Sequence, residues 1–251
     1  MEVKLNALLG KLDQIFDDSE IKQTCIKENQ KWGYSLVTTS MEQSAPLILG
    51  FNWGAAKGQI YQNQTAIKKM NFLDEDVGSL KRIFPFVRQH LGEDYLTKAS
   101  QSNYCFFRSS TEDQINETDI KRCSGVFAEL IEILAPSSII CLSAKLRKYL
   151  IDTNQVCDQK EKTIKFRRGS AEIEFVAVRG KLASGVDIKF LPHPNYPMKR
   201  DARSAAWQFC CGPQYGDDPF SRTPYRYERR SPRCQESTTP NRLIQRNFAS
   251  K

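Results

Sequence analysis

The sequence lacks the features that would place this chain in a membrane or around a metal ion. It contains no run of 18 apolar residues, so no stretch predicts a membrane-spanning helix. Its first residues, MEVKLNALLGKLDQIFDD, have no apolar core of the kind that a cleavable signal peptide needs. No two of its eight cysteines have the Cys-x-x-Cys spacing that is typical of zinc sites. We therefore expect a cytoplasmic protein with reduced thiols, no membrane partner, no cofactor and no metal.

Positive charge is in excess over the whole chain. The 251 residues include 37 Lys and Arg against 29 Asp and Glu, which gives a net charge of +8. A basic protein favours polyanionic partners, but net charge alone does not separate nucleic acid from a membrane surface or from plain solubility. With 40% hydrophobic residues, the chain is long enough to bury one good core.

Five apolar runs are expected to form β-strands. Most are near-continuous rather than alternating, which is typical of strands covered on both faces. Apolar residues at helical spacing predict a helix that begins at Thr118 or Asp119 and ends before Pro136. Strands that alternate with helices predict an α/β fold, a three-layer α/β/α sandwich with a central parallel sheet. The five runs are residues 46–52, 103–109, 137–144, 173–180 and 188–194, and two further helical segments span 1–32 and 72–97, the second interrupted at Pro85.

The composition of the chain changes near Gly212. The last 40 residues hold five of the eleven prolines, eight basic and four acidic residues, and few aliphatic ones. A segment of this composition cannot bury enough apolar surface to fold. We expect one domain over residues 1–211 and a basic, Pro/Arg-rich, disordered tail over 212–251.

A glycine-flanked loop follows the first apolar run. Gly50 and Gly54 enclose Phe51, Asn52 and Trp53 at the point where the strand pattern stops. Glycine lets the backbone turn tightly or approach a ligand, and ligands of open α/β sheets bind beyond the carboxyl ends of the strands. The loop is therefore a candidate site. The alternative is that Asn52 only turns the loop and that the two aromatic residues are core plugs.

The chain has only two histidines, and they lie in different settings. His90 is in a charged helical stretch, so we expect it to be solvated. His193 follows the last apolar run and is flanked by Pro192 and Pro194, which restrict the backbone on both sides. It is either a rigidly held functional imidazole or a turn residue.

Several segments, in the same order along the chain, resemble the uracil-DNA glycosylase superfamily. LILGFNWGA is similar to its first motif, in which a strand ends in Gly-x-Asn-Pro-Gly or a relative, and LPHPNYP is similar to its second, His-Pro-Ser or a variant. SNYCFFRS resembles the strand whose asparagine reads the uracil edge. KRCSGVFAELIEILAPSSIICLSA resembles the helix and strand that follow in the bacterial and archaeal branches. The resemblance spans roughly residues 46–200 and implies the fold of that superfamily.

The sequence departs from the superfamily pattern in places. Trp53 replaces the usual proline, and Asn195 stands where serine is common. The iron–sulfur branches carry four cysteines; Cys123 matches one of them, but Phe107 stands where another would lie. We therefore expect no cluster.

The resemblance implies roles for individual residues. Asn52 would position the attacking water, since an amide cannot titrate and so cannot act as a general base. His193 would donate a hydrogen bond to the base oxygen on which negative charge grows. Asn103 would pair with the uracil edge, and Phe51 or Trp53 could stack on the base. A strand-entry role is the alternative for Asn103.

The residues after His193 are candidates for contacts with DNA. Base-flipping proteins insert apolar wedges into the stack and neutralise phosphates with Lys or Arg, and Met198 beside KRDAR fits this description. A solvated charge run is the alternative. The expected substrate-binding residues are Gly50, Phe51, Trp53, Gly54, Asn103 and Asn195, and the expected DNA-binding residues are Tyr196, Met198, Lys199 and Arg200.

We predict a monomeric DNA glycosylase that flips uracil or a related damaged base out of DNA and hydrolyses its N-glycosidic bond. The first alternative is a nucleic-acid-binding protein of the same fold in which Trp53 fills the pocket and the chemistry is lost. The second is an enzyme that acts on free nucleotides or nucleosides, which would not need a basic surface.

Overall fold

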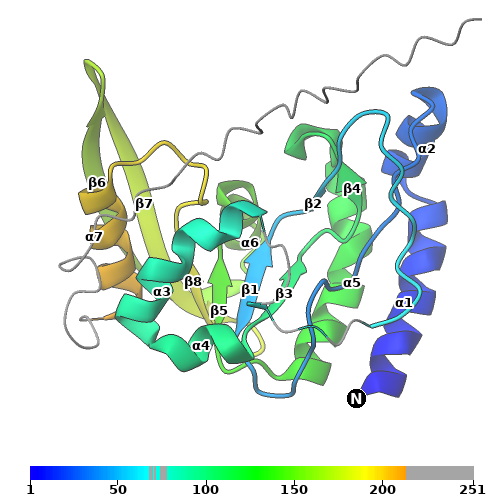
Figure 1. The fold of residues 1–251 in the computed structure, drawn as a ribbon, viewed down its shortest axis with the longest axis horizontal. Coiled ribbons are helices and arrows are strands. Elements are labelled where there is room, and N and C mark those ends of the chain that lie inside the picture. Colours follow the sequence, from blue (N-terminus) through cyan, green and yellow to red (C-terminus); the bar gives the residue numbers. More distant parts are fainter. Residues whose placement is uncertain (68–69, 71, 74–77, 213–251) are drawn as a thin grey trace, which may run out of the picture.

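The computed structural model of the chain describes residues 1–67, 70, 72–73 and 78–212 (Figure 1). The tail predicted over 212–251 lies outside these residues except for Gly212, which follows directly on the last helix. In the described part of the chain, no helix has the length and apolar character needed to cross a membrane.

A six-stranded sheet forms the centre of the fold, with the strand order β3-β1-β5-β8-β7-β6. The first four strands of this order are parallel, and β7 and β6 extend the sheet as antiparallel strands at one edge. The strands are β1 (Leu47–Gly50), β3 (Ser100–Asn103), β5 (Ile139–Cys141), β6 (Val156–Arg168), β7 (Ala171–Leu182) and β8 (Asp187–Phe190), and a separate two-stranded sheet joins β2 (Trp53–Gly54) to β4 (Arg108–Ser109).

The predicted α/β class is confirmed as a mostly parallel sheet flanked by helices, but the sheet is not parallel throughout. The run 173–180, expected as a parallel strand, belongs to the antiparallel β7. Sequence patterns missed β6 because only Ile164 and Phe166 of its central residues are apolar and buried. The run expected as a strand at 103–109 was placed too late, because β3 ends at Asn103.

Helices cover both faces of the sheet (Figure 1). The segment 1–32, predicted to be helical, contains two helices, and the Ser19 side chain starts the second by accepting a hydrogen bond from the Lys22 N–H. Pro85 does not interrupt a helix; it lies in the first turn of one, where its missing N–H costs nothing. The helices are α1 (Glu2–Asp17), α2 (Glu20–Lys27), α3 (Phe84–Leu91), α4 (Glu93–Lys98), α5 (Glu117–Leu134), α6 (Ala144–Asp152) and α7 (Arg200–Cys211), with short 3₁₀ turns η1 (Gly78–Ile83) and η2 (Glu112–Gln114).

The long helix α5 begins at Glu117, one or two residues earlier than the sequence pattern indicates. Its N-cap is Asn116, whose side chain accepts from the Asp119 N–H, and not Thr118 or Asp119. The Asp119 carboxylate is buried and accepts from the backbone N–H groups of Glu20 and Ile21 at the start of α2. It thereby fastens the N-terminal helices to α5.

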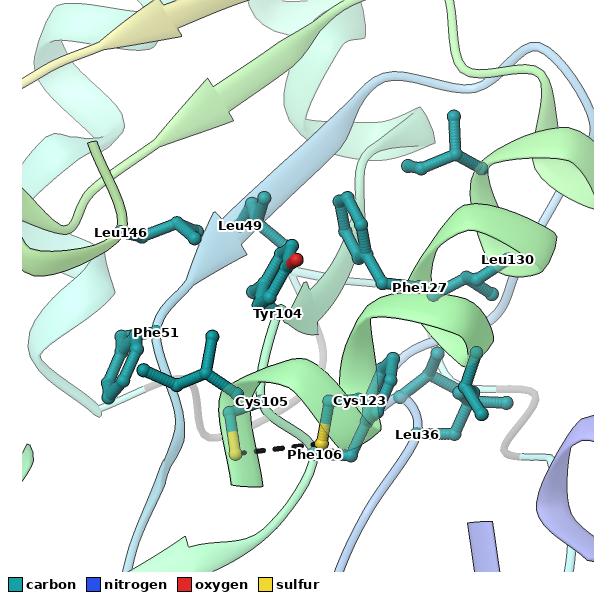
Figure 2. Close-up of a cluster of buried hydrophobic side chains, with 14 of the residues drawn as sticks. Leu36, Leu49, Phe51, Tyr104, Cys105, Phe106, Cys123, Phe127, Leu130 and Leu146 are labelled. Carbon is teal, nitrogen blue, oxygen red and sulfur yellow. Dashed lines mark hydrogen bonds between the residues drawn. The ribbon is translucent and has the colours of Figure 1, made fainter. Parts of the chain in front are cut away.

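Alternate residues of β1 point into two separate cores. Leu47 and Leu49 belong to the core beneath α1 and α5, whereas Ile48 belongs to the core beneath α3, α4 and α7. Figure 2 shows part of the first core, where Leu49 lies among aromatic and aliphatic side chains of the following segments. In the same core, the buried thiols of Cys105 and Cys123 lie 3.7 Å apart and are both free.

The prediction that His90 is solvated is wrong. Its side chain is buried against Trp207 of α7, with the ring centroids 6.3 Å apart. The Nδ1–H donates to the carbonyl of Gly212 at 3.1 Å. Burial lowers the pKa of His90, so the ring is neutral and contributes to packing between α3 and α7.

Replacement of Leu49 by Ala tests the importance of the central strand. Leu49 is fully buried, so the loss of its side chain should lower the free energy of unfolding by about 2–5 kcal/mol in urea titrations. Val3 on α1 is 83% exposed, so Val3→Ala should change it by less than about 0.5 kcal/mol. Equal effects of the two variants would contradict the placement of β1 at the centre of the core.

Candidate functional site

A cavity of about 200 Å³ lies where the parallel strands end. The chain passes from β1 to β3 on one side and then to β5 on the other, so β1 lies at the point where the strand order reverses. Ligands of open α/β sheets bind at such a point, beyond the carboxyl ends of the strands. The lining includes the loop 50–54 after β1, Asn103 at the end of β3, Ser143 after β5 and His193 after β8.

Gly50 and Asn103 are paired in the β1–β3 register. A Cβ atom on Gly50 would collide with Oδ1 of Asn103, so the amide of Asn103 requires a glycine at this position. Asn103 is only 4% exposed, and its side-chain amide has no hydrogen-bond partner among the described residues. Buried amides are normally paired, so this one is free to pair with a ligand in the cavity.

Asn52 has a fixed amide orientation. Its Nδ2 donates to the carbonyl of Trp53 at 3.1 Å and to Oγ of Ser109 at 2.7 Å. A carbonyl can only accept, and the Ser109 hydroxyl donates its own proton to the carbonyl of Thr111, so both contacts require the NH₂ group of Asn52 at this end. The Oδ1 atom is left without a partner among the described residues and can accept a hydrogen bond from water.

The two aromatic residues of the loop are both buried, at 2% exposure for Phe51 and 6% for Trp53. The indole of Trp53 donates to the carbonyl of Ser35 and lies beneath the guanidinium of Arg108, 5.9 Å from the ring centroid. It is therefore anchored in the 31–41 region, and a cavity remains beside it. Phe51 contributes to both the cavity lining and the first core, and the Lys145 ammonium lies 4.7 Å from its centroid.

His193 is held in one tautomer. The backbone N–H of Asn195 donates to its Nδ1 at 3.1 Å. Because Nδ1 is the acceptor, the proton of the neutral ring is on Nε2. The imidazole can therefore offer one N–H donor to a ligand.

The surroundings of His193 favour the neutral ring. Although part of the residue faces solvent, protein atoms displace water around the ring and lower its pKa from 6.5, and the positive charge of Arg203 lowers it further. The ring then stays neutral at physiological pH. A neutral imidazole donates a hydrogen bond without having to lose a proton first.

Asn195, Tyr196, Met198, Lys199 and Arg200 are not among the described residues that line the cavity. The side chain of Asn195 accepts a hydrogen bond from Arg82 at 2.9 Å. It therefore stabilises the loop after His193 and does not form part of the cavity wall. Tyr196 packs against Phe166 and Phe175 of the β6–β7 hairpin, with centroid distances of 6.2 and 5.7 Å.

The three residues after Pro197 differ in exposure. Met198 is half-buried and packs against the second core. Lys199 and Arg200 are exposed at the start of α7. Of the predicted DNA-binding residues, these two face solvent.

Sequence reasoning missed other residues of the lining. Ser143 follows β5 as Asn52 follows β1, and its side chain caps α6 by accepting from the Leu146 N–H at 3.1 Å. Ser79 on η1 and Glu112 on η2 line the cavity as well. Ser143 could have been found by its place after a strand, but no local pattern marks Ser79 or Glu112.

Within the described ranges, no group of three or more His, Cys, Asp or Glu side chains is arranged to hold a metal ion. The cavity itself offers amides, hydroxyls, one carboxylate and one imidazole. These groups suit hydrogen bonding to a small polar ring.

No family model and no curated protein matches the chain.

The ionisation of His193 is directly measurable because the chain has only two histidines. We expect its NMR titration midpoint to lie below 6.5, with ¹⁵N shifts that report a proton on Nε2. Because the lowered pKa favours the neutral ring, the charged ring should become the main form only when the pH falls below this midpoint. A midpoint at or above 6.5, or a proton on Nδ1, would contradict the described geometry.

Proposed function

We propose that the protein is a DNA glycosylase with a fold of the uracil-DNA glycosylase type, which hydrolyses the N-glycosidic bond of uracil or a related damaged base. The observation that carries this proposal is that one cavity is lined by Asn52, Asn103 and His193, which lie at or just after the ends of three strands far apart in the sequence. Its volume of about 200 Å³ is below the roughly 300 Å³ at which pockets for drug-sized ligands begin. It therefore suits a single small ring.

Asn52 supports the proposal because the side-chain polar atom that has no partner among the described residues, Oδ1, is an acceptor. Oδ1 can accept from a water molecule and aim the oxygen of that water at the sugar carbon as the bond to the base breaks. The bonding electron pair leaves with the base, the water oxygen bonds to the sugar, and the water proton is released. An amide suffices for this step when the leaving group is good, because it needs only to orient the water.

His193 supports the stabilisation of the leaving base. As the glycosidic bond breaks, negative charge develops on the oxygen atoms of the base. The neutral Nε2–H, which the Asn195 N–H enforces, is a donor that strengthens its hydrogen bond as this charge grows. An imidazole that remained charged would be more costly to hold in a partly dry cavity.

Asn103 supports recognition of a specific base. Its unpaired amide offers both an acceptor and donors, which match the uracil edge. A base with the opposite pattern, such as cytosine, would leave these buried groups unpaired. Sites of this kind reject such analogues strongly, because unpaired buried polar groups are costly.

Access to the cavity from a duplex requires the base to leave the stack, because the glycosidic carbon is shielded there. The loop between β8 and α7 contains His193 and is called the His193 loop. Lys199 and Arg200 are exposed at or directly after its end, and together with the net charge of +8 they are suited to binding neighbouring phosphates. The anchored indole of Trp53 weakens the alternative in which this side chain fills the pocket and abolishes the chemistry.

The test is incubation of the protein with single- and double-stranded oligonucleotides that contain uracil, hypoxanthine or mismatched thymine, followed by alkaline cleavage at abasic sites. We expect cleavage at one or more of these bases. Tight binding without cleavage would favour a binding protein, and release of uracil from free deoxyuridine alone would favour a nucleoside enzyme. Either result would refute the proposed activity.

Replacement of His193 by Ala should separate catalysis from binding. The single-turnover excision rate should fall by about 10²–10³-fold, which is typical for the loss of one such donor. DNA affinity, measured by fluorescence anisotropy, should change little because the hydrogen bond strengthens only in the transition state. Equal losses of rate and affinity would mark His193 as a structural turn residue.

Replacement of Gly50 by Ala should displace the Asn103 amide from the cavity, because the new Cβ collides with Oδ1. We expect the excision rate at saturating DNA to fall by about 10²-fold, a typical result of a misplacement of ~1 Å. Gly10→Ala on α1 is the matched control, since a Cβ there meets no atom within 4 Å. Unchanged activity of the Gly50 variant would show that Asn103 does not read the base.

A further inference from the structure

Arg203 is a buried cation that has no carboxylate partner in the described part of the chain. It lies in the first turn of α7, is 8% exposed, and forms no ion pair with any described residue. Its guanidinium donates instead to three backbone carbonyls: Nη1 to Pro192 and His193, both at 3.0 Å, and Nη2 to Tyr196 at 2.7 Å. A buried charge is costly unless it is well hydrogen-bonded, so this residue is a candidate for a specific role.

The three carbonyls come from both sides of His193. The planar guanidinium therefore fixes the backbone before, at and after the histidine in one geometry. The turn is completed by the N–H of Tyr196, which donates to the carbonyl of His193 at 2.9 Å. In this conformation the N–H of Asn195 reaches Nδ1 of the ring, so the contacts of Arg203 determine the tautomer through the backbone.

The charge of Arg203 acts on the same ring. Other charged groups near the site are Arg82, which is bonded to Asn195, and Glu112 in the cavity lining. Loss of water around the ring and the Arg203 charge both lower the pKa of His193. If the His193 ring were protonated, its positive charge would lie near the guanidinium of Arg203, which has no carboxylate beside it among the described residues.

We propose that Arg203 is a positioning residue that holds the His193 loop in its donor conformation and keeps the imidazole neutral. The proposal rests on the glycosylase function proposed above in so far as His193 stabilises the leaving base. The residue itself touches neither base nor sugar. Arg203 should therefore affect the reaction only through His193.

The test compares Arg203→Met, which removes the charge and the guanidinium fork, with Arg203→Lys, which keeps only the charge. NMR titration of the two histidines should show a raised His193 midpoint in the Met variant and a midpoint still lowered in the Lys variant, with His90 as an internal reference. This measurement needs no enzymatic activity, so it remains decisive if no base is excised. An unchanged His193 midpoint in the Met variant would overturn the electrostatic part of the proposal.

The kinetic test is a double-mutant cycle. Arg203→Met should lower the single-turnover rate by about 10²-fold, with little change in DNA affinity, and the acid limb of its pH profile should shift to higher pH. In the His193→Ala background the same change should have no further effect, because the residue through which it acts is absent. A full additional loss in that background would mark Arg203 as a general stabiliser and overturn the proposal.

Arg147→Met on α6 is the matched control. Arg147 is a half-buried arginine that also donates to a backbone carbonyl, that of Val176. Among the described residues, its guanidinium makes no hydrogen bond to the loop that contains His193. It should leave the His193 midpoint and the excision rate unchanged. If Arg203→Met does not fold, Arg203→Lys carries the test: a wild-type rate in that variant would show that the guanidinium fork positions nothing.

Discussion

The site depends on the close approach of β1 and β3 at their carboxyl ends. The register places Gly50 beside Asn103, and only the absence of a side chain at Gly50 leaves room for the amide. The end of β1 also holds the turn that follows β3, because the carbonyl of Gly50 accepts a hydrogen bond from the Tyr104 N–H at 3.1 Å. With β5 paired on the other side of β1, three strand ends meet at one edge, and the loops that follow them converge on one cavity.

The strands that could be predicted from the sequence are those that consist mainly of apolar residues. β1 and β5 lie within the predicted runs, and their residues alternate between the two cores that helices cover. β8 overlaps its predicted run, 188–194, only at residues 188–190. β3 has the sequence SQSN and is buried although it is polar. Its hydroxyls are satisfied by a segment about 60 residues earlier: Ser102 donates to the carbonyl of Leu36 and Ser100 to that of Ser40. Local periodicity cannot reveal a partner of this kind, and it cannot reveal the charged edge strand β6 either.

The predictable part of the site follows from residues with special backbone properties. Glycines drew attention to Asn52 because they let the chain turn tightly, and prolines drew attention to His193 because they restrict the backbone on both sides. Arg203 could not be found in this way, since in the sequence it belongs to the charged run KRDAR. Its role depends on three carbonyl oxygens, and every residue carries a carbonyl. Backbone carbonyls are the same in every residue, so the sequence does not show which residues will accept from an arginine. Only the folded structure distinguishes an arginine that holds a loop from one that is solvated.

The two histidines show how the same side chain acquires opposite properties. Loss of water around the ring lowers the pKa of both histidines, which favours the neutral form of each, although His90 is buried and part of His193 faces solvent. His90 donates from Nδ1 to the carbonyl of Gly212, and its Nε2 is buried without a partner among the described residues. His193 accepts at Nδ1 from the N–H of Asn195, which places its proton on Nε2. Protonation state alone would make the two rings equivalent. The backbone group opposite Nδ1 decides which ring nitrogen carries the proton, and in His193 this nitrogen is Nε2, on a residue that lines the cavity.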